Sequence, residues 1–452
     1  MTRKFINTLG EDYDNAIKFL SSAMILAVDT ETTGVEPLSN NILLISIGNA
    51  DNQYVFDVAR LEEHLQPLLN ILSNKLITKI LHNAKFDYKF IKRVLGVSTE
   101  PLFDTMIAEM LLLKGRKVQG FALDDVADKY LGIKMNKDIR KTFGDMLYGD
   151  TFTDDQIFYS GEDVTYLHRI REEQLKFIRK HGLEIVARIE MDVIPAIGDM
   201  ELAGMFIDRT KWLKAEEDAK VLRTVAQKKL DAYFSPSYGL DMFGNCTLNY
   251  NSPKQLLPAL KAIIGDKAKG LASTNEAALK EIDHPIIEAL LDYRDKQKRI
   301  STYGSSFLDD VNPTTGRIHS EFSQLYTDTG RFSSSTPNLQ NIPREKVYRE
   351  AFTAGDDNYR IITVDYSGME LRILADLSRD PIWIECFERG GDLHCEEGTR
   401  ISGTVIRRKG TNGPDDPGEN PHLRQPYKSL NFGVGLTIHD QLKPAQLLET
   451  LT

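Results

Sequence analysis

Carboxylates whose spacing suits joint chemistry occur at three places in the first half of the sequence. Asp29 and Glu31 stand in AVDTETTG, at the end of an apolar, strand-like run. Side chains alternate faces along a strand, so residues two apart point the same way. The pair therefore predicts two carboxylates projecting together from a hydrophobic strand, although a strand that ends in a polar turn gives the same pattern.

The other two places lie in helical patterns. Asn83 and Asp87 are four residues apart in HNAKFDYKF, where capping of a helix start is the alternative role. Tyr159 and Asp163 are four apart in FYSGEDVTYLH, which puts a phenol and a carboxylate on one helical face; a surface pair is the alternative. Glu162 points about 100° away from that face and is treated as a bystander.

Together, the three places predict a metal site. Four carboxylates (Asp29, Glu31, Asp87 and Asp163) would repel one another at neutral pH unless cations neutralised them. Oxygen ligands suit hard divalent ions, so two Mg²⁺ (or Mn²⁺) ions ~3.5–4 Å apart are expected, an arrangement that suits in-line phosphodiester hydrolysis. One ion would activate a water molecule, the other would stabilise the leaving 3′-oxygen, and Tyr159 would orient the water.

The elements that must position these residues belong to an α/β layer. Three short β-rich runs separated by turn signals predict a strand meander over 24–29, 42–49 and 53–58. A helix over 61–72 and a strand over 77–81 follow. The later helices are expected over 84–95, 103–114, 122–131 and 153–181. This pattern predicts a mixed sheet with helices, ending near residue 180.

The order D-x-E, N-x₃-D, Y-x₃-D resembles the proofreading 3′–5′ exonucleases of the Asp-Glu-Asp-Asp class, tyrosine variety, over roughly residues 20–180. The resemblance implies a ribonuclease H-like fold, a complete site at the carboxylates and tyrosine above, and contact of Asn83 with a single-stranded DNA 3′ end. FDTMIAEMLL at 103–112 is also similar to that family and implies a structural role for Asp104. Ser160 stands where alanine is common in the family.

From about 184 to 310 the pattern is almost all helical, with polar breaks such as FSPSYG and DMFGN. The segment 285–307 is amphipathic and basic, and a solvated helix face explains it. The chain returns to strand near 360 with RIITVDYS. Residues 403–422 are rich in Gly, Pro and Asn, which is typical of a flexible loop.

The string TGRFSSSTPNLQNIP within 316–343 resembles the family A DNA polymerases, the bacterial repair and bacteriophage replicative type. The resemblance implies that Arg331 contacts the minor groove near the primer end, where the acceptors look alike for every correct base pair. It also implies that Gln340 and Asn341 help to hold the template–primer. A turn-stabilising surface arginine is the alternative for Arg331.

VDYSGMELRILADLS at 364–378 resembles the first palm motif of the same family. The resemblance implies that Asp365, at the end of a strand, binds the catalytic metals. Glu370 would lie against the sugar of the incoming dNTP, and Arg372 would support the palm through hydrogen bonds. His394 would lie near the nucleotide phosphates, with a capping or surface histidine as the alternative.

HLRQPYKSLNFGVG at 422–435 resembles the fingers helix. Arg424, Lys428 and Phe432 are spaced i, i+4, i+8 on one face, which suits two cations over a triphosphate and an aromatic ring under the base. Pro426 must then lie in the first helical turn. The tyrosine–glycine pair that the family carries further along this helix is absent here.

The resemblance implies four domains: an exonuclease over 1–183, a helical thumb over 184–312, a partial α+β palm over 313–400, and partial fingers with a truncated tail over 401–452. The His-Asp-Glu palm motif of the family is not reached before Thr452. Asp365 alone cannot hold two ions for nucleotidyl transfer, so primer extension by this chain alone is not expected. A second polymerase chain could supply the missing parts.

Several functions remain open at this point. The first is a family A DNA polymerase with proofreading, present as a truncated or split product. The alternatives are a stand-alone 3′–5′ exonuclease whose second half binds DNA, a non-enzymatic DNA-binding or scaffold fragment, and an RNA-processing exonuclease. The last of these would not need the TGR…QNIP string.

Composition limits the choice. The 452 residues carry 56 basic and 66 acidic side chains, a net charge of −10, which argues against nucleic-acid binding through overall charge but not through a local basic groove. Three cysteines without metal-like spacing suit a reducing cytoplasm. No apolar run approaches a membrane span or a secretory signal, so a bacterial or phage-infected host cytoplasm is expected.

Overall fold

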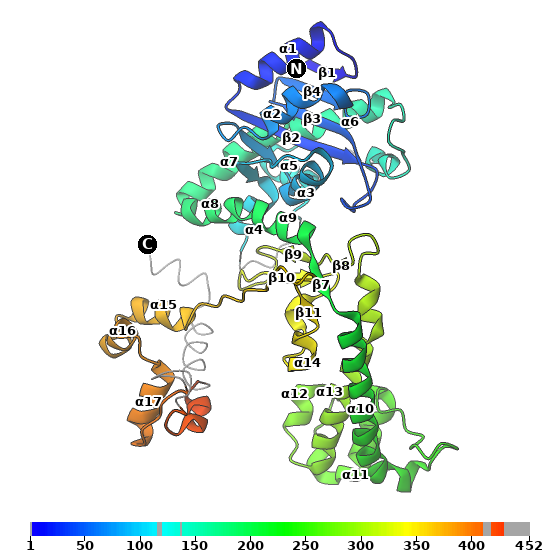
Figure 1. The fold of residues 1–452 in the computed structure, drawn as a ribbon, viewed down its shortest axis with the longest axis vertical. Coiled ribbons are helices and arrows are strands. Elements are labelled where there is room, and N and C mark those ends of the chain that lie inside the picture. The colour runs from blue at the N-terminus through cyan, green and yellow to red at the C-terminus, as the bar shows by residue number, and fades with distance from the viewer. Residues whose placement is uncertain (1, 115–119, 136–137, 410–416, 429–452) are drawn as a thin grey trace. The chain divides into compact units, whose positions relative to one another are not determined.

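The computed structural model describes residues 2–114, 120–135, 138–409 and 417–428. The chain divides into two compact units, residues 1–360 and 361–452 (Figure 1). The four domain boundaries expected from the sequence stay predictions. None of the helices in the described ranges is both long and apolar enough to cross a membrane.

A six-stranded mixed sheet forms the first part of unit 1, in the order β1-β4-β3-β2-β5-β6. Its strands are β1 Thr2–Ile6, β2 Ile25–Thr32, β3 Ile42–Gly48, β4 Asn52–Asp57, β5 Thr78–Leu81 and β6 Leu102–Asp104. The pairs β2–β3 and β3–β4 are antiparallel, which confirms the predicted meander. The pairs β1–β4, β2–β5 and β5–β6 are parallel, which confirms the mixed sheet.

Apolar cores lie on both faces of this sheet, because neighbouring side chains of a strand point to opposite faces. Val55 packs with Leu43, Phe143 and Tyr159 in one cluster. Phe56 belongs to the larger cluster on the other side. The helices around the sheet are α1 Glu11–Ser22, α2 Gln66–Leu72, α3 Ala84–Leu95, α4 Thr105–Leu112, α5 Leu123–Leu131, α6 Asp154–Thr165 and α7 Leu167–Lys180, with short 3₁₀ turns η1 Glu62–His64 and η2 Asp138–Phe143.

Three differences from the sequence expectation concern this layer. The strand β1 and the helix α1 were not predicted, since the expected layer began at residue 24. The helix expected over 103–114 starts as the strand β6, because pairing with β5 outweighs local helical preference there. The single helix expected over 153–181 is divided at Tyr166 into α6 and α7.

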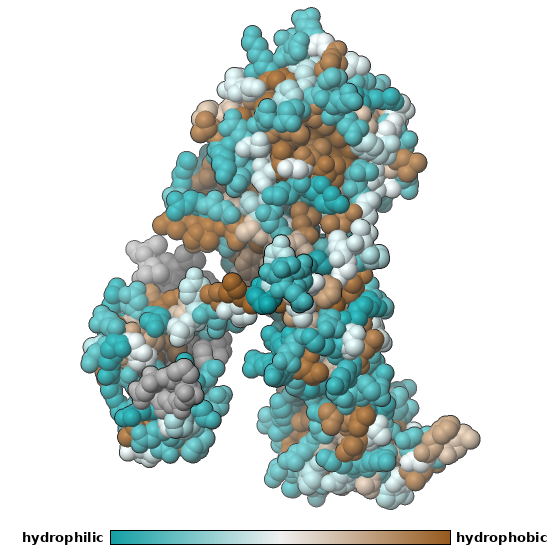
Figure 2. All heavy atoms as spheres, viewed as in Figure 1, coloured by the Kyte–Doolittle hydropathy of each residue, from teal (hydrophilic) through white to brown (hydrophobic). Residues whose placement is uncertain are grey.

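The region after residue 183 is mainly helical, as predicted. Its helices are α8 Glu184–Asp192, α9 Ile194–Ala203, α10 Arg209–Tyr238, α11 Pro253–Ile264, α12 Glu276–Lys280 and α13 Pro285–Tyr303, with η3 Gly265–Ala268 and η4 Ser305–Asp310. The break expected at FSPSYG falls at the end of that string: α10 continues through Pro236, which lies in its last turn, and ends at Tyr238, with Gly239 as its C-cap. Figure 2 shows apolar residues gathered at the tip of this region, where the loop after α10 exposes Met242 by 90% and Phe243 by 81%.

Two small sheets complete unit 1. They are built from β7 Met205–Ile207, β8 Arg317–Ile318, β9 Glu321–Ser323, β10 Ser333–Ser335 and β11 Phe352–Thr353, in the orders β11-β7-β8 and β10-β9. The turn η5 Leu339–Asn341 and the helix α14 Lys346–Arg349 follow β10. Trp212 is fully buried, stacks on Phe307 of η4 and contacts Phe352 of β11 edge to face, which ties the first turn of α10 to the three-stranded sheet.

Unit 2 contains α15 Met369–Ser378, α16 Pro381–Glu388, α17 Leu393–Ser402 and η6 Pro421–Leu423. The three α-helices share a small core of Leu371, Cys386 and Leu393. The strand expected near 360 is wrong. Residues 360–366 are irregular, and Ile362 and Val364 are 84% and 85% exposed. A strand needs a partner for its backbone N–H and C=O groups, and no strand in the described ranges pairs with this run.

Candidate active site

Strand β2 carries the first two carboxylates. Asp29 lies opposite Ser46 and Glu31 opposite Leu44 in the antiparallel register with β3. The preceding residues Leu26, Ala27 and Val28 are fully buried, so this end of β2 is fixed in the sheet. The two side chains leave the strand on the same face, as the D-x-E spacing predicts.

Helix α6 brings the phenol and the third carboxylate. It begins with a capping box, in which the Thr153 hydroxyl accepts from the N–H of Gln156 and the Gln156 side chain accepts from the N–H of Thr153. The buried hydroxyls of Ser160 and Ser46 share a hydrogen bond of 2.7 Å, which attaches α6 to β3 next to Asp29. Ser160 is thus one of the contacts between helix and sheet.

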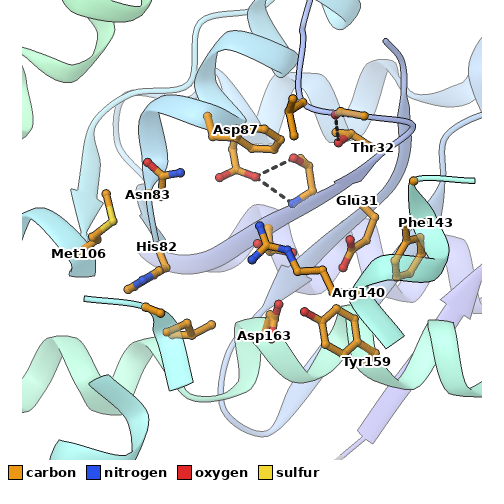
Figure 3. Close-up of a pocket in the computed structure, with 18 residues that line it drawn as sticks. Glu31, Thr32, His82, Asn83, Asp87, Met106, Arg140, Phe143, Tyr159 and Asp163 are labelled. Atoms are coloured by element: carbon orange, nitrogen blue, oxygen red, sulfur yellow. Dashed lines mark hydrogen bonds between the residues drawn. The ribbon is translucent and has the colours of Figure 1, made fainter. Parts of the chain in front are cut away.

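Asp29, Glu31 and Asp163 offer oxygens that all lie within 4.8 Å of one another. Figure 3 shows Glu31, Asp163 and Tyr159 facing a common space. Burial raises the pKa of Asp29 and of Glu31 well above the ordinary values, and repulsion from the neighbouring carboxylates raises both further. Such a group of hard oxygen donors fits a divalent cation, which would remove the repulsion.

Asp87 lies apart from that trio but lines the same pocket. Its Oδ1 accepts from Thr30 N at 2.9 Å and Thr30 Oγ1 at 2.6 Å, as Figure 3 shows. Burial raises the pKa of Asp87 to about 7, although the bonds from Thr30 act in the opposite direction. The structure therefore brings three of the four predicted carboxylates together and places the fourth beside them.

Capping of the start of α3 was the alternative role for Asn83 and Asp87, but Asp104 binds the N–H groups there. Asn83 is the N-cap of α3, with φ 65°, but its side chain makes no cap hydrogen bond. The buried Asp104 carboxylate instead accepts from the N–H groups of Asn83 and Ala84, and also from those of Met106 and Ile107 at the start of α4. The structural role expected for Asp104 is confirmed.

Sequence reasoning missed Arg140. This residue of η2 lines the same pocket, of about 350 Å³, and its charge lowers the pKa of both Asp29 and Glu31. Figure 3 shows Arg140 beside Glu31 and Asp163. The run 133–147 has neither helical nor strand periodicity, so the sequence holds no signal for this placement beyond the basic character of the residue.

The residues predicted to contact duplex DNA lie near the β9–β10 hairpin. Arg331, Gln340 and Asn341 are all exposed. The Gln340 amide donates to Phe332 O at 3.1 Å, and Asn341 O accepts from the hydroxyl of Tyr303 at 2.5 Å. These bonds hold the main chain near the three exposed residues, and the Gln340 side chain is itself tied to the backbone of Phe332.

In unit 2 the predicted residues fall into two groups. Asp365 and Glu370 are exposed, the first in the irregular run and the second in the first turn of α15. Arg372 donates to Ser367 O at 2.9 Å and lies over the ring of Phe387, while its support of a palm stays a prediction.

The second group surrounds Asp392, which sequence reasoning missed although it directly precedes Leu393 and His394. Arg424 binds Asp392 Oδ2 through Nη2 at 2.8 Å. Burial lowers the pKa of His394, and the charges of Arg424 and Lys428 lower it further. Residues 424–428 are helical after η6, so Pro426 does lie in the first turn. Phe432 lies outside the described residues.

Comparisons with known proteins match two separate stretches of the chain. The family model 3′-5′ exonuclease matches residues 7–177, and the model DNA polymerase family A matches residues 219–441. DNA polymerase I of Borreliella burgdorferi is 32% identical over 448 residues, which cover 94% of this chain and 46% of that protein. DNA polymerase I of Aquifex aeolicus is 29% identical over 451 residues, covering 94% and 70%.

The chain spans about half the length of most of the curated relatives that it matches. Among solved structures, the POL domain of Pol1 from M. smegmatis in complex with DNA primer-template and dNTP aligns with a TM-score of 0.73. The alignment covers 95% of this chain and 71% of that one at 24% sequence identity, which supports the common fold.

Proposed function

The chain belongs to the family A DNA polymerases and carries their 3′–5′ exonuclease domain, and from this premise we propose that the pocket of the mixed sheet removes nucleotides from DNA 3′ ends. The observation that carries the proposal is the approach of three carboxylates, Asp29, Glu31 and Asp163, to within 4.8 Å. The substrate would be a single-stranded 3′ end, such as a frayed primer terminus.

The cofactor that we propose is a pair of Mg²⁺ (or Mn²⁺) ions. Asp29, Glu31 and Asp163 would hold it, with Asp87 as the fourth carboxylate. Bound there, such ions activate a water molecule and stabilise the leaving 3′-oxygen. The raised pKa of Asp29 and of Glu31 supports the proposal, because buried, mutually repelling carboxylates gain most from a cation.

Two side chains beside the carboxylates would act on the water and the phosphate. Burial and the neighbouring carboxylates raise the pKa of Tyr159, so the phenol keeps its proton at neutral pH and can donate it in a hydrogen bond that orients the attacking water. Arg140 can form charge-assisted hydrogen bonds with the phosphate. Asn83, which lines the same pocket, would contact the single strand.

The test compares two neighbouring substitutions on α6. Asp163→Asn removes one charge from the cluster and should reduce Mg²⁺-dependent digestion of a 3′-labelled single strand by roughly a hundredfold or more. Glu162→Gln removes a charge from the adjacent residue, which is outside the carboxylate trio, and should keep the wild-type rate. Equal rates for the two variants would reject the site.

For the second half we propose a polymerase role in which Arg331, Gln340 and Asn341 hold the primer–template duplex. The proposed dNTP ligands are Glu370, His394, Arg424, Lys428 and Phe432, and the proposed metal ligand is Asp365. In the described ranges Asp365 belongs to no group of three metal-binding side chains. DNA synthesis would therefore draw on further carboxylates, from a second polymerase chain or another segment.

The exposed, irregular run around Asp365 favours a second candidate, an exonuclease whose other half serves only to bind DNA. Primer extension distinguishes the two. Incorporation of dNTP, by the chain alone or with an added polymerase fragment, supports the first candidate. Failure in both cases supports the second.

A further inference from the structure

The segment 322–331, which leads from β9 to Arg331, is fastened to elements from the first half of the chain. Lys85 of α3 donates to Phe322 O at 2.6 Å, and Phe322 N donates to Glu201 Oε1 at 2.7 Å. Glu201 is buried and also binds Lys85 Nζ at 2.6 Å. A charged cluster thus fixes the start of the segment against the helix that carries Asp87.

The next residues continue the attachment. Gln324 is buried and donates to the backbone and the carboxylate of Glu190 in α8, at 2.8 and 2.7 Å. Leu325 has φ 52°, a backbone conformation that bulky residues rarely adopt, and its side chain is buried in the main core of the six-stranded sheet. Burial of this leucine offsets the backbone strain, so the turn is set by the sheet layer.

Lys114, two residues after the end of α4, lies at the centre of the turn. Its Nζ donates to Leu325 O at 2.7 Å and to Thr327 O. Its Cε lies 3.8 Å from the position that a Cβ on Gly330 would take. Thr327 also donates through its hydroxyl to Arg331 O at 2.8 Å. One ammonium group therefore donates hydrogen bonds to two carbonyls, those of Leu325 and Thr327, in the turn that ends at Arg331.

We propose that Lys114 is a positioning residue for duplex DNA binding: from the exonuclease layer it holds the 325–331 turn in the conformation that presents Arg331. The inference rests on the proposed function of Arg331 in the primer–template contact. It adds that the exonuclease layer is a structural part of the duplex-binding surface. Lys114 acts on the turn through its two carbonyl contacts and needs no contact with DNA.

The test is a double-mutant cycle in the full chain, with the Kd for a primer–template duplex as the readout. Arg331→Ala should weaken binding about tenfold, the loss typical of a specific arginine contact. Lys114→Met, which keeps the length of the side chain and removes the ammonium, should weaken binding by a similar factor. The double variant should bind like Arg331→Ala alone, because Lys114 acts through that residue.

A direct contact of Lys114 with phosphate would give a different pattern. The losses would then multiply in the double variant, and Lys114→Met would reduce the salt slope of log K by about 0.9. Either result overturns the proposal, as does an unchanged Kd in Lys114→Met when Arg331→Ala binds weakly. An unchanged Kd in Arg331→Ala would instead reject the duplex role proposed for that residue.

The controls separate positioning from general damage. Lys176→Met removes an exposed ammonium of α7 and should leave the duplex Kd unchanged. The rate of single-strand digestion reports the folding of the sheet layer, and Lys114→Met should keep it. If Lys114→Met does not fold, Lys114→Leu, which also lacks a donor, takes its place under the same criteria. Loss of both activities in the folded variant would overturn the proposal.

Discussion

Tyr159 and Asp163 illustrate what single residues reveal. Their i, i+4 spacing predicted a common face, and both line the pocket. The same reasoning placed Asp87 in the carboxylate group but could not foresee that Thr30 binds it through both N–H and hydroxyl. Arg140 was not predicted as a site residue, because its position depends on the tertiary path of η2, which has no periodic sequence pattern.

The phenol gives the first prediction at this scale. Tyr159→Phe should slow 3′-end hydrolysis by roughly tenfold to a hundredfold, because the attacking water loses its orienting hydrogen bond. Binding of single-stranded DNA should stay the same, since the ring remains in place against Phe143. Tyr130→Phe is the matched control, because that phenol binds Glu109. An unchanged rate in Tyr159→Phe would remove the proposed role.

The second residue-scale prediction concerns pH. Because the pKa of Asp87 is about 7 in the fold and the ordinary value is 3.8, the metal-free fold binds more protons than the unfolded chain between these values. Its stability should therefore fall as pH rises through this window. A cation needs the ionised carboxylates, so the stabilisation by Mg²⁺ should grow as pH rises.

Thermal unfolding in chelator and in Mg²⁺, at about pH 5 and about pH 8, measures both trends. Asp87→Asn cannot titrate and should flatten the decline in chelator. If Mg²⁺ increased the Tm by the same amount at both pH values, the raised pKa values would be contradicted.

At the scale of elements, apolar patterning predicted the strands and helices that carry the site. β2, β3, β4 and α3 fall within a few residues of their expected ranges. The short strand β6 could not be found, because three residues give no period and β5 alone makes them a strand. The strand expected at RIITVDYS was an error of the opposite kind. The run is apolar enough for a strand but has no strand partner in the described ranges.

Asp104 supplies the prediction for this scale. It joins β6 to the first turns of α3 and α4 through four N–H groups, so Asp104→Ala should lower the free energy of unfolding by about 3 kcal/mol. Asp208→Ala removes an ordinary N-cap from α10 and should cost about 1 kcal/mol. Denaturant unfolding compares the two variants. Equal losses of unfolding free energy would show that capping both α3 and α4 stabilises the fold no more than capping one helix.

At the scale of the whole molecule, the motif strings predicted the family and the order of its parts, and the family models match both parts. The attachment of residues 322–331 to α3, α8 and the end of α4 was beyond sequence reasoning. Phe322, Gln324 and Leu325 lie more than a hundred residues from the partners that hold them, and their spacing carries no sign of these contacts.

The pair of carboxylates on β2 gives the most direct test. Asp29→Ala combined with Glu31→Ala leaves Asp163 as the only one of the three grouped ligands, so Mg²⁺-dependent digestion of 3′-labelled single-stranded DNA should fall by roughly a thousandfold or more. The measurement is the initial rate at saturating Mg²⁺, with folding checked by circular dichroism. A folded double variant that digests the strand at the wild-type rate would contradict the metal site.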